Sequence, residues 1–382
     1  MMKTKGERPT LQQPYQHAML GHTKEDRINT VYGGGGHVVI LGAGASVAAT
    51  VRNPLADRKK LPLMNNFIEV VGLTDIVSDL PNHIKFDNFE LLYSKLYLDD
   101  SNSKLIKEIE KRVYNYFKSL KLPDEPTIYD YLVLSLRSRD LIATFNWDPF
   151  LYQAWTRNYN KGNRPYIAFL HGNVSIGYST IDKRSGPAGM YAKATKNYMA
   201  PTRLLYPVTQ KNYNDDEYIK SQWDMLESFL SDKDVKLVTV FGYGAPETDV
   251  EAVNIMDKAW GGGSVRNMEQ FEIIDVRSEK QVVKQWNKFI ESHHYDYATN
   301  YFESSLAKNP RRTSESYFQH IEPMTIDEAF SASNPVPDNF KTLEEMRNWF
   351  KPLFDAEKKW EQNAKKKKGS SLHRIGNMAG DE

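Results

Sequence analysis

The chain contains five short apolar runs between residues 37 and 276, and each is followed by glycine or polar residues. Such short runs with little polar interruption are typical of strands buried on both faces of a parallel sheet. Segments with helical spacing separate them, so we predict an α/β fold with a Rossmann-like, doubly wound parallel sheet. The runs are 37–41 (HVVIL), 140–146 (DLIATFN), 166–172 (YIAFLHG), 236–244 (KLVTVFGYG) and 271–276 (FEIIDV).

Helical patterning dominates the segment of about 63–136, between the first two predicted strands. Within it, apolar side chains recur every three or four residues along KLIKEIEKRVYNYFKSL, as on one face of a helix. We therefore predict a helical insertion inside a domain that spans 37–300.

Polar segments flank this predicted domain at both ends. Residues 1–36 lack periodicity and end in four glycines, which indicates an arm with a flexible joint. Residues 301–364 are mostly helical in pattern, with a weak core signal. The lysine-rich segment 365–382 is typical of a disordered tail.

Composition excludes several classes of protein. Hydrophobic residues make up 40% of the 382 residues, enough for a core, and 50 Lys+Arg balance 49 Asp+Glu, so direct nucleic-acid binding is not expected. No apolar stretch of about 18 residues predicts a membrane span, and the first residues do not resemble a secretory signal, so we expect a cytoplasmic protein. Cysteine is absent, which excludes disulfides, thiolate catalysis and Cys-ligated metal; we expect no metal.

The sequence GAGAS directly follows the first predicted strand. Small residues here let the backbone approach a ligand, and the next helix N-terminus favours a phosphate. The dinucleotide fingerprint G-x-G-x-x-G is incomplete, because position 47 is Val and no acid follows about twenty residues later. The alternative is a tight strand–helix turn without a ligand. The residues are Gly42, Ala43, Gly44, Ala45 and Ser46.

Polar residues also end the next two predicted strands. Thr144, Asn146 and Asp148 lie in ATFNWD, where side chains point into the crevice of an α/β sheet, or else turn the chain and cap the next helix. His171, in FLHGN, has the chemistry of a general base or a ribose ligand, although a hydrogen-bonded structural role is the alternative.

The last two predicted strands end in a similar way. Gly242 and Gly244 form a second strand-then-glycine turn in TVFGYG. Asp275 closes FEIID, where an acid can accept hydrogen bonds from ribose hydroxyls or cap the helix that starts near Ser278. All five motifs lie at carboxyl ends of predicted parallel strands, so we expect them to meet in one crevice.

In this order, the motifs resemble those of the sirtuin (SIR2) superfamily over roughly residues 37–295. GAGAS is similar to its NAD pyrophosphate loop, Thr144-x-Asn146-x-Asp148 to its TxNxD motif, and His171-Gly172 to its catalytic HG. The resemblance implies that Asn146 holds a water or the ribose and that Asp148 binds the nicotinamide carboxamide. It also implies that His171 accepts a proton and that the pyrophosphate is bound by the amides near Ala43, Gly44 and Ala45. The glycine turn of Gly242 and Gly244 is implied to bind NAD. Asp275 is a further candidate for binding NAD, through the adenosine ribose.

Features in which the chain differs from protein-deacylating sirtuins narrow the function that we expect. Protein-deacylating sirtuins carry a four-cysteine zinc module, and this chain has no cysteine. Together with the helical insertion, this is similar to the SIR2-like effectors of bacterial anti-phage defence, which hydrolyse NAD. The chain's length resembles that of the SIR2 subunits that act beside a HerA-type ATPase. The resemblance therefore implies an NAD glycohydrolase that yields nicotinamide and ADP-ribose, with NAD as substrate and no metal.

Two rival functions stay open at this point. A lysine deacylase would use the same NAD chemistry, and a non-catalytic subunit would sense NAD or ADP-ribose without turnover. Since no sensor domain is evident, we expect control through assembly, as a homo-oligomer larger than a dimer or with a HerA-type partner. Aromatic residues in the insertion and the C-terminal region are the candidate interface.

Overall fold

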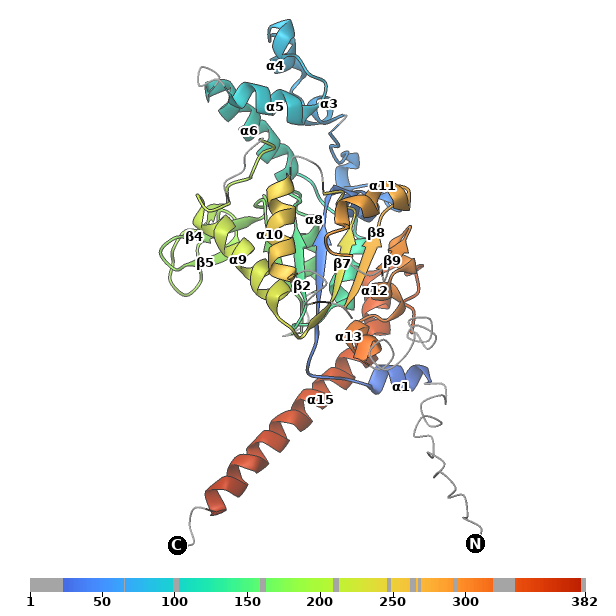
Figure 1. Ribbon diagram of the computed structural model, residues 1–382. Coiled ribbons are helices and arrows are strands. Elements are labelled where there is room, and N and C mark those ends of the chain that lie inside the picture. The colour runs from blue at the N-terminus through green and yellow to red at the C-terminus, as the bar shows by residue number, and fades with distance from the viewer. Residues whose placement is uncertain are drawn as a thin grey trace, which may run out of the picture.

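A single parallel sheet of six strands forms the centre of the computed structural model (Figure 1). The strands stand in the order β3-β2-β1-β7-β8-β9, and every neighbouring pair is parallel. The predicted doubly wound sheet and its five strands are therefore confirmed. The bounds are β1 Gly36–Leu41, β2 Leu141–Thr144, β3 Tyr166–Phe169, β7 Val235–Phe241, β8 Gln270–Ile274 and β9 Tyr295–Ala298. The structure describes residues 23–64, 66–98, 103–158, 163–208, 213–245, 249–261, 266, 269–290, 295–318 and 334–378.

Alternate side chains of β1 build two hydrophobic cores, one on each face of the sheet. Val38 and Ile40 belong to one core, and Val39 and Leu41 to the other, because successive side chains of a strand point to opposite faces. Burial on both faces explains why this strand reads as an unbroken apolar run.

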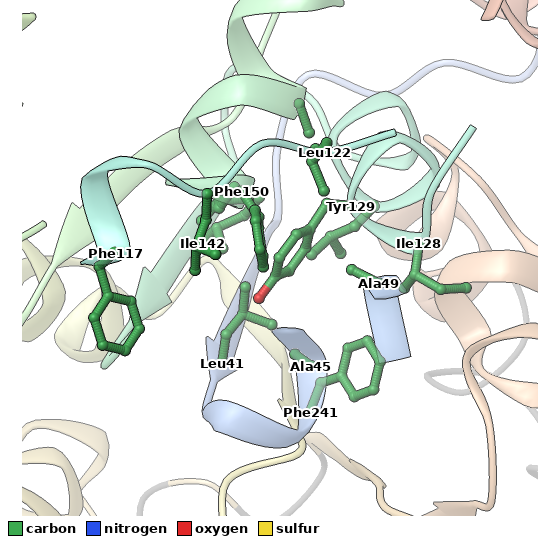
Figure 2. Packing of buried hydrophobic residues seen from close by; sticks show 14 of the residues in the cluster. Leu41, Ala45, Ala49, Phe117, Leu122, Ile128, Tyr129, Ile142, Phe150 and Phe241 are labelled. Carbon is green, nitrogen blue, oxygen red and sulfur yellow. The ribbon is translucent and has the colours of Figure 1, made fainter. Parts of the chain in front are cut away.

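Helices cover both faces of the sheet, as a doubly wound fold requires. Figure 2 shows part of the core on the Val39 face, where side chains of β1, α2 and α7 meet. Over that face pack α2 Ala43–Val51, α7 Ile128–Ser135, α8 Phe150–Arg157, α12 Ser305–Lys308 and α15 Leu343–Met378. Over the opposite face pack α9 Glu217–Ser231, α10 Val250–Trp260, α11 Glu279–Val283 and η5 Lys284–Trp286.

The predicted helical insertion lies between β1 and β2. Figure 1 shows α3 to α6 together beyond one end of the sheet, whereas α7 packs against α2, α8 and α12 in the body. A capping box between Thr127 and Asp130 fixes the start of α7. The bounds are η1 Ala56–Arg58, α3 Phe67–Val71, α4 Thr74–Ser78, η2 Asn82–Ile84, α5 Phe89–Tyr97 and α6 Ser103–Lys118.

The sequence patterns did not predict strands β4, β5, β6 and β9. The segment after β3, expected to be irregular, holds a three-stranded antiparallel sheet of β4 Ile176–Ser179, β5 Arg184–Pro187 and β6 Ala200–Pro201. These strands are short and rich in glycine, serine and proline, so they carry no alternating apolar pattern. The edge strand β9 is also only four residues long and half buried at three of them.

The first and last described helices contact each other. Helix α1 Lys24–Asn29 contacts α15, and η6 Tyr301–Glu303 and α13 Thr313–Ser316 complete the mostly helical C-terminal region. The expectation of a disordered tail from residue 365 differs from the structure, in which α15 continues to Met378. Lysine favours helix, so the run of four lysines from residue 365 can extend a helix that is already formed. Residues 1–22 of the predicted arm and 379–382 lie outside the described residues, and the predicted domain boundaries stay predictions.

A buried cluster of charges attaches α15 to the body of the protein. The carboxylate of Glu357, which is 0% exposed, accepts hydrogen bonds from Arg311 Nε at 2.7 Å, Arg311 Nη2 at 2.6 Å and Arg312 Nη1 at 2.7 Å. Burial alone would raise the pKa of Glu357, but the charges and hydrogen bonds of Arg311, the charge of Arg312 and the charge of Arg137 outweigh it and lower the pKa to about 2.

Among the described residues, the helices are all too short or too polar to cross a membrane.

Candidate functional site

A cavity of about 900 Å³ opens at the carboxyl ends of β1, β2, β3, β7 and β8. This is the edge where the strand order reverses between β1 and β7, the usual ligand crevice of open α/β sheets. Ten of the twelve predicted site residues line it. Ala45 and Thr144 instead lie buried directly behind the cavity wall. The lining residues are Gly42, Ala43, Gly44, Ser46, Asn146, Asp148, His171, Gly242, Gly244 and Asp275.

The two glycine turns interlock at the floor of this cavity. Gly42 N–H donates to Phe241 O and Gly44 N–H to Gly242 O, both at 3.0 Å. A Cβ on Gly42 would lie 2.5 Å from Gly242 O. Gly242 has a φ of +61°, and a Cβ there would lie 2.4 Å from Ala45 N. Only glycine permits this approach, so the glycine pattern has a structural reason independent of any ligand.

The hydrogen bonds between the two glycine turns limit which backbone N–H groups can donate to a bound anion. Gly44 N–H is donated to Gly242 O, and Ala45 N–H to Gly42 O at 3.1 Å. Two of the three amides that were expected to bind a pyrophosphate are therefore already donated to protein carbonyls in this structure. The third, that of Ala43, lies at the first residue of α2, where the helix dipole favours negative charge.

The half-buried Asn146 belongs to a cluster of four polar side chains, of which the other three are buried. Its Nδ2 donates to Gly42 O at 2.8 Å, to Ser46 Oγ at 2.9 Å and to Tyr129 Oη at 3.2 Å. Ser46 Oγ in turn donates to Asp148 Oδ2 at 2.6 Å and lies 2.7 Å from Tyr129 Oη. The Ser46 hydroxyl has one hydrogen, and it donates that hydrogen to Asp148. The hydroxyl of Tyr129 is therefore the donor in its hydrogen bond with Ser46. The cluster thus fixes the orientation of Asn146.

Asp148 both lines the cavity and caps the next helix, the two roles considered from the sequence. Its Oδ1 accepts from Phe150 N at 3.1 Å at the start of α8, while its Oδ2 accepts from Ser46 inside the cavity wall. Burial raises the pKa of Asp148 to about 6, although the hydrogen bonds from Ser46 and Phe150 act in the opposite direction. A carboxyl group with this pKa changes protonation near neutral pH.

Tyr129 is a member of this cluster that the sequence analysis missed. It lies on α7, within the helical run TIYDYLVLSL, and its side chain is completely buried. Figure 2 shows its ring among Leu41, Ile142 and Phe150, with the hydroxyl oxygen directed toward the turn after β1. The only signal in the sequence is that a buried tyrosine needs a partner for its hydroxyl.

His171 lies at the end of β3 with its side chain 6% exposed. The edge of its ring meets Phe145 at a centroid distance of 4.9 Å, and Tyr213 stacks on it at 6.0 Å. Gly172 follows with a φ of +76°, and a Cβ there would lie 2.0 Å from Arg203 O. Aromatic rings and this glycine turn therefore hold the imidazole at the cavity wall.

Asn173 joins the histidine loop to the asparagine loop. Its Nδ2 donates to Asp148 O at 2.7 Å and to Asn146 O at 3.2 Å. Its Oδ1 accepts from Ser175 N at 2.9 Å. This residue is the last letter of FLHGN, and nothing in the sequence distinguished it from a loop asparagine. It fixes the distance between the two motifs.

Asp275, at the end of β8, is paired with Arg277. Arg277 N and Nε both donate to Oδ1 at 2.9 Å, and Nη2 donates to Oδ2 at 2.6 Å. Burial alone would raise the pKa of Asp275, but Arg277 outweighs it and lowers the pKa. The alternative of a helix cap is not what the structure shows, because Ser278 and Gln281 form the capping box of α11.

The far wall of the cavity comes from the insertion and is mainly apolar. It consists of Leu61, Pro62, Met64, Phe67, Glu90 and Phe117, with Trp147 and Pro207 beside them. The cavity thus has a polar end near Asp275 and an apolar end near Trp147. Its volume of about 900 Å³ lies near the upper end of the range of small-molecule and cofactor sites.

No group of three or more His, Asp or Glu side chains that could hold a metal ion occurs in the described part of the chain. The absence of a bound metal stays a prediction.

The comparisons with known proteins find similarity in structure and none in sequence. The fold is similar to a Sir2 homologue solved with NAD, with 12% identity, a TM-score of 0.36, and coverage of 79% of this chain and 95% of that one. It is also similar to a Sir2 bound to acetylated peptide, with 10% identity, a TM-score of 0.35, and coverage of 69% and 87%. No protein-family model matches the chain, and no curated protein does.

Proposed function

We propose that the protein is an NAD glycohydrolase that cleaves NAD to nicotinamide and ADP-ribose. The observation that carries the proposal is the convergence of Asn146, Asp148 and His171 with the turn after β1 in one cavity of about 900 Å³. The two residues after β2, the histidine after β3 and the turn after β1 belong to three different strand ends, so their meeting is a property of the fold and not of one local motif.

The reaction breaks the bond between nicotinamide and ribose and develops positive charge at the anomeric carbon. Enzymes accelerate such a step by orienting the substrate and by placing a water molecule at that carbon. In the proposed mechanism Asn146, held by Ser46 and Tyr129, positions the water or the ribose. His171 binds the ribose hydroxyls and accepts the proton of the attacking water. Asp148 accepts a hydrogen bond from the nicotinamide carboxamide.

The substrate lies along the cavity in this proposal. Its pyrophosphate faces the start of α2, where the helix dipole favours an anion, and its adenosine ribose faces Asp275. The apolar end near Phe117 and Trp147 takes the nicotinamide side and limits the entry of bulk water.

Product analysis distinguishes this reaction from lysine deacylation. The protein is incubated with NAD alone and with NAD plus an acetyl-lysine peptide, and the products are separated by chromatography. A glycohydrolase forms nicotinamide and free ADP-ribose at the same rate in both arms. Turnover that requires the peptide and yields an acylated ADP-ribose would establish a deacylase, and binding of NAD without turnover would establish a sensor.

Replacing Tyr129 with phenylalanine tests how Asn146 is positioned. The change removes one hydroxyl and leaves Ser46 without one donor, so we expect kcat to fall about tenfold, the size of one lost buried hydrogen bond, with little change in KM. Steady-state kinetics with NAD measures both. Tyr131→Phe is the matched control, because Tyr131 lies on the same helix outside the cavity lining. Equal kcat values for the two variants would show that Tyr129 does not help to position Asn146 for catalysis.

We further propose that the protein acts as an NAD-depleting effector of bacterial anti-phage defence, controlled through assembly with itself or a HerA-type ATPase. A constitutive glycohydrolase would exhaust the NAD of its own cell, so basal activity must be low. We predict a homo-oligomer larger than a dimer. Light scattering across a concentration series measures the mass, and a monomer with full constitutive turnover would contradict this prediction.

A further inference from the structure

The ribose-facing end of the cavity differs from that of an NAD-specific site. Such sites present a carboxylate whose oxygens accept hydrogen bonds from the ribose hydroxyls, and the same negative charge repels a 2′-phosphate. Asp275 occupies this place at the end of β8 and is 6% exposed. In the binding mode proposed above, the adenosine ribose faces this carboxylate, so the partners of Asp275 bear on which dinucleotide the cavity accepts.

Arg277 already satisfies that carboxylate. Its N and Nε donate to Oδ1, and its Nη2 donates to Oδ2, so three of the about four acceptor positions of the carboxylate are filled. The ion pair has no net charge, so a phosphate group beside it meets little repulsion. The hydroxyl-binding and phosphate-excluding functions of the acid are both weakened.

The guanidinium is also placed to contact a ligand. The side chain of Arg277 is 47% exposed and lines the cavity. A Cβ on Gly244 would lie 2.6 Å from Nη1, so the guanidinium lies directly over the glycine turn after β7. Since Nε and Nη2 bind Asp275, the Nη1 group faces the side of Gly244. An arginine in this geometry can bind a phosphate while it keeps one bond to the carboxylate.

We propose that the cavity accepts NADP as well as NAD, with Arg277 binding the 2′-phosphate of the adenosine ribose. The proposal rests on the proposed function, because it assigns a second substrate to the same site. Water adds to the anomeric carbon, the bond to nicotinamide breaks, and nicotinamide leaves with the bonding electron pair. The proton of the water passes to His171 and then to solvent, and the second product is ADP-ribose 2′-phosphate.

The kinetic test compares kcat/KM for NADP and NAD in the wild type, in Arg277→Gln and in Arg184→Gln. Arg184 is an exposed arginine of β5 outside the cavity lining, so its replacement controls for the loss of one positive charge. We expect the two kcat/KM values of the wild type to agree within about tenfold. Arg277→Gln should lower the ratio of NADP to NAD about tenfold or more, as for a lost charge-assisted hydrogen bond.

A wild-type preference for NAD above about tenfold, or an equal loss with both substrates in Arg277→Gln, would overturn the proposal. A binding measurement keeps its failure separate from that of the proposed function. Calorimetric titration compares ADP-ribose with ADP-ribose 2′-phosphate, and we expect the phosphate to bind at least as tightly in the wild type and about tenfold more weakly in Arg277→Gln. If neither dinucleotide is cleaved, the proposed function fails, while the titration still decides the role of Arg277.

Discussion

Replacement of His171 or Asn146 with alanine is expected to lower NAD turnover about a hundredfold or more, the effect of losing a positioned proton acceptor or a group that stabilises the transition state. The His171 ring lies against Phe145 and Tyr213 at the cavity wall, and Asn146 is held by Gly42, Ser46 and Tyr129. Nicotinamide release measured at saturating NAD gives the loss in kcat.

His83→Ala is the control for this pair. His83 is an exposed residue of η2 outside the cavity lining, so its replacement should leave turnover unchanged. Thermal unfolding of all three variants establishes whether they fold. A folded His171→Ala or Asn146→Ala protein with the wild-type rate would mean that the residue has no part in the chemistry.

Replacement of Glu357 with alanine is expected to lower the free energy of unfolding by about 3–5 kcal/mol, the usual cost of leaving buried charges without their partner. Arg311 and Arg312 have side chains that are 0% and 3% exposed, and both donate to Glu357. Denaturation in urea measures the change. Glu361→Ala, at an exposed position of the same helix, is the matched control. Equal unfolding midpoints for the two variants would show that the buried cluster does not hold α15.

The pH dependence of stability follows from the same carboxyl group. The folded protein lowers the pKa of Glu357 from 4.5 to about 2, so its carboxylate contributes stability in full above about pH 4.5. This contribution is lost as the pH falls from about 4.5 toward 2. The difference in unfolding free energy between the wild type and Glu357→Gln should therefore shrink over that interval.

The sequence predicts the sheet well because the sheet depends on local patterns. A strand such as β1, buried on both faces, must be apolar at every position, and the polar residue that follows it must lie at the carboxyl edge. For this reason Asn146, His171 and Asp275 could be placed in one crevice before any contact was known. The order of the strands in the sheet came only from the structure.

The partners of those residues could not be predicted in the same way. Tyr129 lies in an apolar helix and Asn173 in a loop, and each is recognised only by hydrogen bonds to residues of other elements. Arg277 pairs with Asp275 only two residues before it, but the sequence does not show that its side chain folds back onto that carboxylate. The same holds for Glu357, which in the sequence is one more charged residue of a polar helix and in the structure is completely buried. The strands β4 to β6 lack a pattern because they are short and consist largely of glycine, serine and proline, so no run of alternating apolar residues marks them.

The most direct test of the account is NMR observation of NAD incubated with an equimolar amount of the protein, beside the same amount of His171→Ala. At this ratio even a low basal activity converts a measurable fraction of the substrate. We expect signals of free nicotinamide and ADP-ribose to grow together with the wild type, and at a rate about a hundredfold lower with the variant. NAD that stays intact with the wild type as long as with His171→Ala would contradict it.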